Sequence, residues 1–269
     1  MTPAGLPVWL NGGIISQAEA RIDPADRGLL LGDGLFETMR VAGGVVRHFT
    51  LHMDRLVHGA GVLMLPPPDR GLIAQAAADL LAACGLQDGS LRLTLTRGPG
   101  PRGLLPPARV RPTMLLTATA SLPPAIPVRL ATGSHRRDEE SVLSRIKSLN
   151  YLPSILARME AAGRGADDAL LLNRAGHVAE TSASTLVAVM GGAALTPPVR
   201  DGALPGIARG VLLAAGMLRE SRLSPAMLRK AEAVFALNSL CAREVVAIDG
   251  HALPRQPALL ARLVAYLDG

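Results

Sequence analysis

Lysine, cysteine and aromatic residues are scarce in this chain of 269 residues. Aromatic residues make up 2%, too few for the stacking platforms that bind single-stranded nucleic acids, and the basic residues form no continuous block. The net charge of +6 suits a pocket for an anionic small molecule equally well, so no nucleic-acid partner is expected. The two cysteines, Cys84 and Cys241, are too few for a disulfide framework or a thiolate metal site. They favour a reducing cytoplasm, and no metal is expected.

Long apolar runs are missing as well. No uninterrupted run reaches the roughly 18 residues that span a bilayer, so no membrane association is expected. The opening stretch MTPAGLPVWLNGG has no basic segment followed by an apolar one, which predicts the absence of a signal peptide. Hydrophobic residues make up 49% and charged residues 19%, a composition that argues against disorder. We therefore expect a folded cytoplasmic protein with one large domain or two modest ones.

The shortage of lysine is more informative about function than the other shortages. Of 28 basic residues only Lys147 and Lys230 are lysines, and the other 26 are arginines. A composition dominated by Ala, Arg, Gly, Leu and Pro replaces lysine wherever only a positive charge is needed. Lysine can lose its proton and attack a carbonyl, whereas arginine stays protonated. Lys147 stands among short polar residues and is the candidate for such chemistry, while Lys230 is predicted to be a solvated helix position.

The best linker in the chain is the proline-rich stretch of residues 121–127. It predicts an N-terminal α+β domain over residues 1–120 and a C-terminal α+β domain over residues 128–269 that carries Lys147. Alternation and helical periodicity predict the elements of the first domain. These are a strand near residue 9, a hairpin of strands 37–41 and 45–48, helices over 49–63 and 69–84, and strands over 91–96 and 114–119.

The second half begins with a predicted strand over residues 128–131. A polar stretch, 133–144, then leads to Lys147. The remaining predicted elements are helices over 152–162 and 206–215, strands over 169–172, 177–180 and 186–189, strands near Val234 and Val245, and a terminal helix.

Three features of this second half point to related chemistry. Lys147 precedes a helix, Glu180 ends a strand, and residues 204–210 open a helix. Each has an ordinary explanation, since surface lysines, solvated acids and helix starts are common. Together they are the parts of a pyridoxal phosphate (PLP) site: a lysine for a Schiff base, an acid for a protonated ring nitrogen, and free N–H groups for a phosphate.

At this point the sequence resembles the class IV, fold type IV, PLP enzymes, which include branched-chain and D-amino acid aminotransferases and aminodeoxychorismate lyases. Ordered motifs at family-like spacing carry the resemblance over nearly the whole chain. They are Asp26-Arg27-Gly28, Gly32-Asp33-Gly34-Leu35-Phe36-Glu37-Thr38-Met39-Arg40, His52-Met53-Asp54-Arg55-Leu56, Lys147-Ser148-Leu149-Asn150-Tyr151-Leu152, the segment around Glu180, Gly206-Ile207-Ala208-Arg209, and Asn238-Ser239.

The resemblance implies a two-domain α+β fold of type IV, a homodimer, and a cofactor between the domains. It makes Lys147 the Schiff-base lysine and proton shuttle, and Glu180 the partner of the ring nitrogen. It assigns the cofactor phosphate to the Arg55 side chain, to the N–H groups of Ile207 and Ala208, and to the Ser239 hydroxyl. The family often has threonine where this chain has Ala208, so we expect a lost side-chain contact and weaker retention of the cofactor.

The resemblance also leaves two reactions open. The first is a lyase that converts 4-amino-4-deoxychorismate into 4-aminobenzoate and pyruvate, toward folate. The second is an aminotransferase for D-amino or branched-chain amino acids with a 2-oxo acid acceptor.

In the D-amino acid branch an arginine, a histidine and a tyrosine anchor the substrate. Arg102 matches the arginine, whereas Leu104 stands in the place of the histidine and Phe36 in that of the tyrosine. The more apolar pocket favours the ring-bearing lyase substrate. A binding protein that has lost turnover is disfavoured, because Lys147, Glu180 and Arg55 are all present.

Overall fold

The computed structural model describes residues 5–268. Residues 1–4, which begin the stretch that argued against a signal peptide, and residue 269 lie outside the described part. The fold is α+β, as expected, and the chain divides into two compact units. The first unit extends to Leu122 and includes Ile146–Asn150; the second comprises Pro123–Arg145 and the chain from Tyr151 onward. Within residues 5–268, no helix is long and apolar enough to cross a membrane.

The first unit is built on a six-stranded antiparallel sheet in the order β2-β1-β6-β5-β3-β4. Its strands are β1 (Val8–Leu10), β2 (Gly13–Ile15), β3 (Gly34–Ala42), β4 (Val45–Val46), β5 (Gly89–Thr96) and β6 (Thr113–Thr119). Its helices are α1 (Arg27–Leu31), α2 (Phe49–Val62) and α3 (Arg70–Cys84). Helices α2 and α3 and the long strands agree closely with the ranges that periodicity predicts, whereas the short helix α1 was not predicted.

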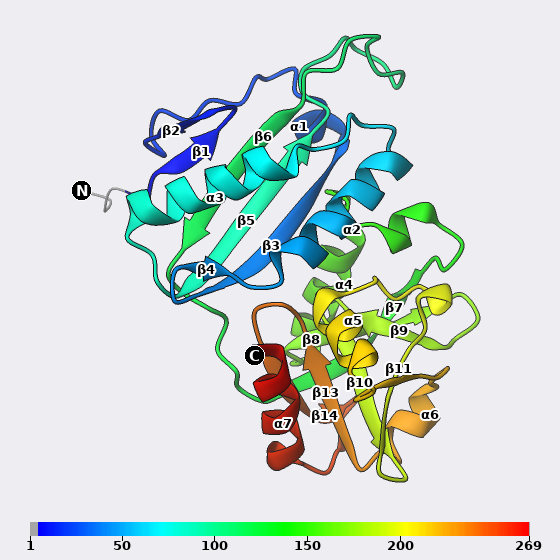
Figure 1. Ribbon diagram of the computed structural model, residues 1–269. Coiled ribbons are helices and arrows are strands. Elements are labelled where there is room, and N and C mark those ends of the chain that lie inside the picture. The colour runs from blue at the N-terminus through cyan, green and yellow to red at the C-terminus, as the bar shows by residue number, and fades with distance from the viewer. Residues whose placement is uncertain (1–4, 269) are drawn as a thin grey trace. The chain divides into compact units, whose positions relative to one another are not determined.

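The core of the first unit lies between its sheet and helices α2 and α3, which run across the same face of the sheet (Figure 1). Strand β3 contributes alternate residues to this core, among them Leu35 and Met39, because successive side chains of a strand point to opposite faces. Helix α2 contributes Met53 and Leu56 from its apolar stripe. Glu37 is completely buried on the inward face of β3, in a series that is otherwise apolar.

The segment Ile146–Asn150 packs with the first unit, although the sequence assigned Lys147 to the C-terminal domain. The N–H of Phe36 donates to the carbonyl of Lys147 at 3.0 Å, and the N–H of Leu149 donates to the carbonyl of Gly34 at 2.9 Å. Ile146 joins the hydrophobic core of the first unit. The difference arises because a short strand-like pairing with β3, more than 100 residues away in sequence, leaves no mark in the local pattern.

The second unit contains a nine-stranded sheet in the order β12-β11-β10-β13-β14-β7-β8-β9, with β15 paired to β14. Its strands are β7 (Val128–Arg137), β8 (Asp168–Asn173), β9 (Val178–Thr181), β10 (Thr185–Met190), β11 (Ala193–Thr196), β12 (Arg219–Glu220), β13 (Ala233–Leu237), β14 (Ala242–Ile248) and β15 (His251–Ala252). Its helices are α4 (Leu152–Gly163), α5 (Ile207–Ala214), α6 (Pro225–Leu228) and α7 (Pro257–Asp268), with 3-10 turns at Val142–Arg145 and Val199–Asp201.

Both faces of this second sheet are covered. Leu186 and Ala188 of β10 join one hydrophobic cluster, whereas Val187 and Val189 join another with residues of α5 and α7. Strand β7 is longer than the predicted 128–131, because its polar end, Arg136 and Arg137, pairs with β8 beyond a bulge. Lys230 lies in a turn after α6 and is exposed, so its predicted helical position was wrong.

Candidate functional site

Lys147 lies beside Phe36 in the first unit. Its Nζ is 4.4 Å from the centroid of the Phe36 ring, and the guanidinium carbon of Arg92, on the neighbouring strand β5, is 3.9 Å from the same centroid. An aromatic face attracts a nearby cation through the ring quadrupole. The structure thus brings together the predicted Schiff-base lysine and one predicted substrate-binding residue.

A buried charge network holds Arg55, the predicted phosphate ligand. Its Nε donates to Oε1 of Glu37 at 2.8 Å, and its NH2 group donates to Oε2 at 2.5 Å. His52, one helical turn earlier on α2, donates from Nδ1 to the same Oε2 at 2.6 Å. The side chain of Arg55 is 8% exposed and that of Glu37 is completely buried. The carboxylate therefore fixes the direction of the guanidinium.

The protonation states in this network follow from burial and hydrogen bonding. Burial opposes ionisation of Glu37, but the hydrogen bonds from Arg55 and His52 outweigh it, so the pKa of Glu37 is lowered. Burial lowers the pKa of His52, and the hydrogen bond to Glu37 does not fully compensate. His52 is therefore neutral at physiological pH, with its proton on Nδ1, and its Nε2 is buried without a hydrogen-bond acceptor or donor among residues 5–268.

Glu180 lies on β9 in the second unit. Its Oε2 accepts a hydrogen bond from the N–H of Leu204 at 3.0 Å, and its Oε1 lies 3.0 Å from the NH2 group of Arg137. The side chain is 11% exposed. A nearly buried carboxylate with an arginine and a backbone donor is favoured in its ionised form. Such a carboxylate can accept a proton-bearing ring nitrogen as a further partner.

Helix α5 begins directly after the Leu204 contact. Its N-cap, Gly206, makes no side-chain capping bond, and Ile207 and Ala208 form the first turn. The N–H groups of a first helical turn have no acceptor within the helix and attract anions. A Cβ at position 206 would come within 2.9 Å of Oγ1 of Thr185, so glycine allows the helix start to approach β10. The predicted phosphate donors Ile207 and Ala208 therefore lie next to the Glu180 segment.

Ser239 lies in the turn between β13 and β14, and Asn238 fixes that turn. The side-chain oxygen of Asn238 accepts from the N–H groups of Leu240 and Cys241 at 2.9 and 3.0 Å. Its amide nitrogen donates to the carbonyl of Ala183 and to the hydroxyl of Ser184, at 3.3 and 3.2 Å. The predicted second-unit residues Glu180, Ile207, Ala208 and Ser239 thus come from segments that hydrogen bonds and close packing link.

The predicted substrate residues Arg102 and Leu104 lie in the loop of residues 98–112, which joins β5 to β6. Arg102 is exposed, and Leu104 is 83% exposed. They lie in the first unit, as do Phe36, Arg55 and Lys147, whereas the other predicted residues lie in the second.

Several residues that organise these groups escaped the sequence analysis. Glu37 and His52 stood in motifs that it quoted, but only Arg55 received a role. The signal for Glu37 was an acid at an inward position of a predicted strand, where every neighbour on that face is apolar. Arg137 and the N–H of Leu204 gave no such signal, because their relation to Glu180 depends on chain folding over 43 and 24 residues.

Known proteins resemble this chain in sequence. The sequence profile of the family "Amino-transferase class IV" matches residues 34–249. A putative branched-chain-amino-acid aminotransferase of Methanocaldococcus jannaschii is 36% identical, over 77% of this chain and 74% of that protein. D-alanine aminotransferase of Staphylococcus haemolyticus is 32% identical, over 76% of this chain and 73% of that protein.

Solved structures resemble the chain in fold. The crystal structure of 4-amino-4-deoxychorismate lyase from Pseudomonas aeruginosa has a TM-score of 0.83 and 34% identity, with 97% of both chains covered. The chain spans only 49% of the length of two branched-chain-amino-acid aminotransferase-like proteins of Arabidopsis thaliana, to which it is 30% identical. The chain belongs to the class IV aminotransferases, a family of fold type IV enzymes whose cofactor is pyridoxal phosphate.

Proposed function

We propose that this enzyme is a PLP-dependent lyase that converts 4-amino-4-deoxychorismate into 4-aminobenzoate and pyruvate, a step toward folate. The observation that carries the proposal is the apolar ring of Phe36 beside Lys147. The ring of Phe36, which carries no hydroxyl group, faces the Lys147 amine. Leu104 presents an exposed aliphatic side chain on its loop. A substrate with a six-membered carbon ring gains from such apolar surfaces, whereas D-alanine depends on polar contacts to its carboxylate.

The side chains and backbone groups of this chain fit PLP. The uncapped start of α5 offers N–H groups to a phosphate, and the Ser239 turn is hydrogen-bonded to the same part of the unit. Arg55 adds a positively charged donor whose direction Glu37 fixes. Glu180 supplies the ionised carboxylate that a protonated pyridine nitrogen needs. These donors and the acceptor match the phosphate and the ring nitrogen, and the Lys147 amine matches the aldehyde.

When bound, PLP supplies an aldehyde for an amine and a ring that withdraws electrons from the carbon next to the substrate nitrogen. The Lys147 Nζ holds the cofactor at rest and then moves the proton that this carbon loses. Glu180 keeps the ring nitrogen protonated, because its carboxylate accepts that proton in a hydrogen bond. Loss of the proton from the substrate ring and expulsion of enolpyruvate give 4-aminobenzoate, and proton return to enolpyruvate gives pyruvate. Arg102 binds a substrate carboxylate.

The alternative is an aminotransferase for D-amino or branched-chain amino acids. Its specific support is the similarity to the aminotransferases of M. jannaschii and S. haemolyticus. Both reactions use the same lysine, acid and phosphate contacts. They differ in one requirement: the aminotransferase needs a 2-oxo acid acceptor to complete its cycle, whereas the lyase forms both products from one substrate.

This difference defines the experiment. Purified enzyme loaded with PLP is given 4-amino-4-deoxychorismate without any 2-oxo acid, and 4-aminobenzoate and pyruvate are measured. In parallel it is given D-alanine, L-leucine and L-valine with 2-oxoglutarate. We expect equal amounts of the two lyase products and slower transamination. Efficient transamination without 4-aminobenzoate would establish the alternative.

Two variants test the proposed roles of Glu180 and Arg102. Glu180→Gln is expected to retain PLP but to slow both reactions, because a neutral pyridine ring is a poorer electron acceptor. Arg102→Ala is expected to raise KM for either substrate class. A Glu180→Gln enzyme as active as the wild type would refute the ring-nitrogen role.

We propose further that the enzyme works as a homodimer in the cytoplasm. Helix α1 supports the dimer, because Leu29, Leu30 and Leu31 are 65%, 61% and 44% exposed. Consecutive exposed leucines are unusual on the surface of a monomer. The unpaired Cys84 and Cys241 are compatible with a reducing compartment. Light scattering during size-exclusion chromatography tests the dimer, and a mass of one chain would contradict it.

A further inference from the structure

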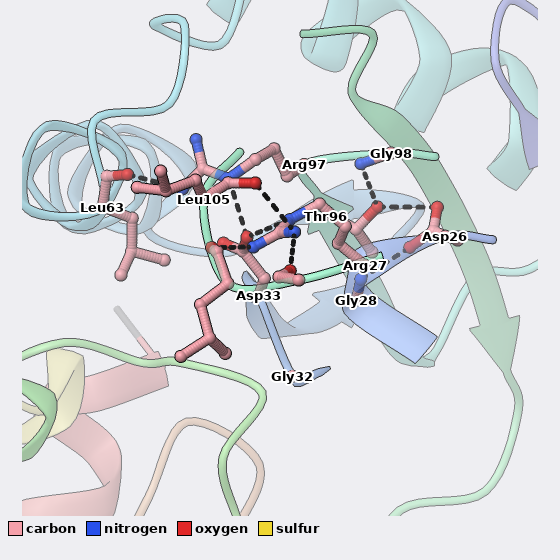
Figure 2. A network of polar contacts seen from close by, with 12 residues as sticks. Asp26, Arg27, Gly28, Gly32, Asp33, Leu63, Thr96, Arg97, Gly98 and Leu105 are labelled. Atoms are coloured by element: carbon pink, nitrogen blue, oxygen red, sulfur yellow. Dashed lines mark hydrogen bonds and ion pairs between the residues drawn. The ribbon is translucent and has the colours of Figure 1, made fainter. Parts of the chain in front are cut away.

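Arg27, the first residue of α1, is 4% exposed and reaches into the loop of residues 98–112 (Figure 2). Its NH1 group donates to the carbonyl of Gly103 at 3.0 Å, and its NH2 group donates to the carbonyl of Leu104 at 2.7 Å. Its Nε donates to Oδ2 of Asp33 at 2.9 Å. The planar guanidinium presents these donors in a fixed geometry. One buried side chain thus holds the backbone of the loop near its tip.

The base of the same loop is fixed by backbone contacts. The N–H of Arg27 donates to the carbonyl of Gly98 at 2.9 Å, and the N–H of Gly100 donates to the carbonyl of Ala25 at 3.2 Å. Gly98 has a φ of +82°, and a Cβ there would lie 1.8 Å from the carbonyl oxygen of Arg111. Only glycine permits this close approach of the two limbs of the loop. The loop is therefore anchored at its base and again near its tip.

Asp33 connects this anchor to helix α2. Its Oδ2 also accepts from Nε of Arg97 at 2.7 Å, and the NH2 group of Arg97 donates to the carbonyl of Leu63 at 2.7 Å, at the end of α2 (Figure 2). Burial opposes ionisation of Asp33, but hydrogen bonds from Arg97 and Arg27 outweigh it, and the pKa of Asp33 is lowered. The ionised carboxylate joins two arginines, Arg27 at the start of α1 and Arg97 just after β5. Arg97 in turn contacts the end of the helix that carries Arg55.

The side chains at the loop tip are exposed although the backbone is fixed. Leu104 and Leu105 are 83% and 84% exposed, while Arg27 holds the carbonyl of Leu104 and the preceding one. A loop with two exposed leucines would gain by folding them onto the protein if its backbone were free. The anchor prevents this movement and keeps the side chains of Arg102 and Leu104 available.

We propose that Arg27 and Asp33 are positioning residues that fix the substrate-recognition loop and thereby determine substrate affinity. Arg27 holds the carbonyls of the two successive residues Gly103 and Leu104, and Asp33 holds Arg27. The part of this inference that concerns substrate rests on the proposed role of Arg102, whereas the anchoring of the loop does not depend on the reaction.

The first test is hydrogen–deuterium exchange of the PLP-loaded enzyme without substrate. Arg27→Lys keeps the charge beside Asp33 but removes the fork that binds two carbonyls. Exchange in residues 98–112 is expected to accelerate about ten-fold, corresponding to the loss of about one hydrogen bond to a charged donor. Arg70→Lys is the matched control, because the exposed Arg70 pairs with Asp54 on the surface of the same unit.

A second variant disturbs the contact between Arg27 and the loop without changing a charge. A Cβ at Gly100 would lie 3.0 Å from Cδ of Arg27, so Gly100→Ala is expected to push the loop away from Arg27 and also accelerate exchange. Unchanged exchange in both Arg27→Lys and Gly100→Ala would overturn the anchor. This pair keeps the test informative if one variant folds poorly.

The second test separates loop position from chemistry. In both variants KM is expected to rise about ten-fold while kcat and the Kd for PLP stay within about two-fold of the wild type, because substrate binding alone depends on loop position. KM is measured with whichever substrates the wild type converts, the chorismate derivative or the amino acids, so a wrong assignment of the reaction does not obscure the result. Faster exchange with unchanged KM for every substrate would overturn the positioning role.

Discussion

The two units hold their candidate functional groups in different ways. In the first unit, arginines are fixed by carboxylates: the buried Glu37 holds Arg55, and the partly buried Asp33 holds Arg27 and Arg97. In the second unit, backbone N–H groups supply many of the hydrogen-bond donors. The start of α5 offers N–H groups directly, and the N–H of Leu204 positions Glu180.

This difference predicts where substitutions should have large effects in each unit. Removing one member of a buried ion pair leaves the other charge unpaired in a poorly solvated place, at high cost. Backbone donors survive most substitutions, since the side chain does not supply the hydrogen bond. The alanine at position 208 illustrates the point, because it lacks a hydroxyl but keeps its N–H at the first turn of α5. We therefore expect substitutions to act strongly in the first unit and weakly at the α5 start.

The largest effect is expected at Lys147, whose side chain reacts and has no backbone substitute. Lys147→Ala should lower kcat by about 10²–10⁴-fold or more, the range that removal of a positioned proton-transfer group produces. Borohydride reduction followed by mass spectrometry should label Lys147 in the wild type, and Lys230→Ala should retain both label and activity. A label on Lys230 would refute the assignment.

The next effect tests the buried pair directly. Arg55→Ala should lower the unfolding free energy of the apoenzyme by about 3–5 kcal/mol, because Glu37 loses its main partner within the protein. Urea titration at neutral pH measures it. Arg70→Ala removes an arginine whose pair with Asp54 is about half exposed, and should cost less than about 1 kcal/mol. Equal losses in the two variants would contradict the contrast between buried and exposed pairs.

Acid should weaken the first unit in two stages. The lowered pKa of His52 means that, as pH falls below about 6.5, the unfolded chain takes up a proton that the folded chain does not. Stability should then fall by up to about 1.4 kcal/mol per pH unit. The lowered pKa values of Glu37 and Asp33 contribute stability that is complete above about pH 4.3 and is lost at lower pH, as these groups protonate in the folded state.

Substitution of His52 isolates the first stage. His52→Gln should flatten the pH dependence of the unfolding free energy between about pH 6.5 and 5, measured by urea titration at several pH values. His58→Gln is the control, since His58 is exposed on the same helix. If His52→Gln keeps the full slope, His52 is not the group that titrates on unfolding.

The smallest effect is expected at the α5 start. Ala208→Thr adds one hydroxyl to a turn that already presents its N–H groups, and should tighten PLP binding by roughly two- to ten-fold, equivalent to one hydrogen bond. Ala208→Val adds the same bulk without the hydroxyl and should not tighten binding. Fluorescence titration of the apoenzyme with PLP measures both. A gain with valine equal to that with threonine would assign the effect to packing.

The sequence alone determined much of this protein. The motifs around Glu37, Arg55, Lys147 and Glu180 identified the family, which the matches to known proteins confirm. Alternation and helical periodicity located β3, α2 and α3 closely, because each of these elements buries one face in its own unit and therefore carries a regular pattern. The scarcity of lysine drew attention to Lys147.

The tertiary structure decided the connections between these elements. Lys147 pairs with β3 although more than 100 residues separate them, and Arg27 holds a loop 76 residues further on. Arg137 reaches Glu180 only because the chain returns to it. Periodicity shows which face of a helix or strand is buried, because burial selects apolar side chains at regular intervals along the chain. It does not record which distant carbonyl or carboxylate a buried arginine meets, since that depends on how the chain closes over long separations.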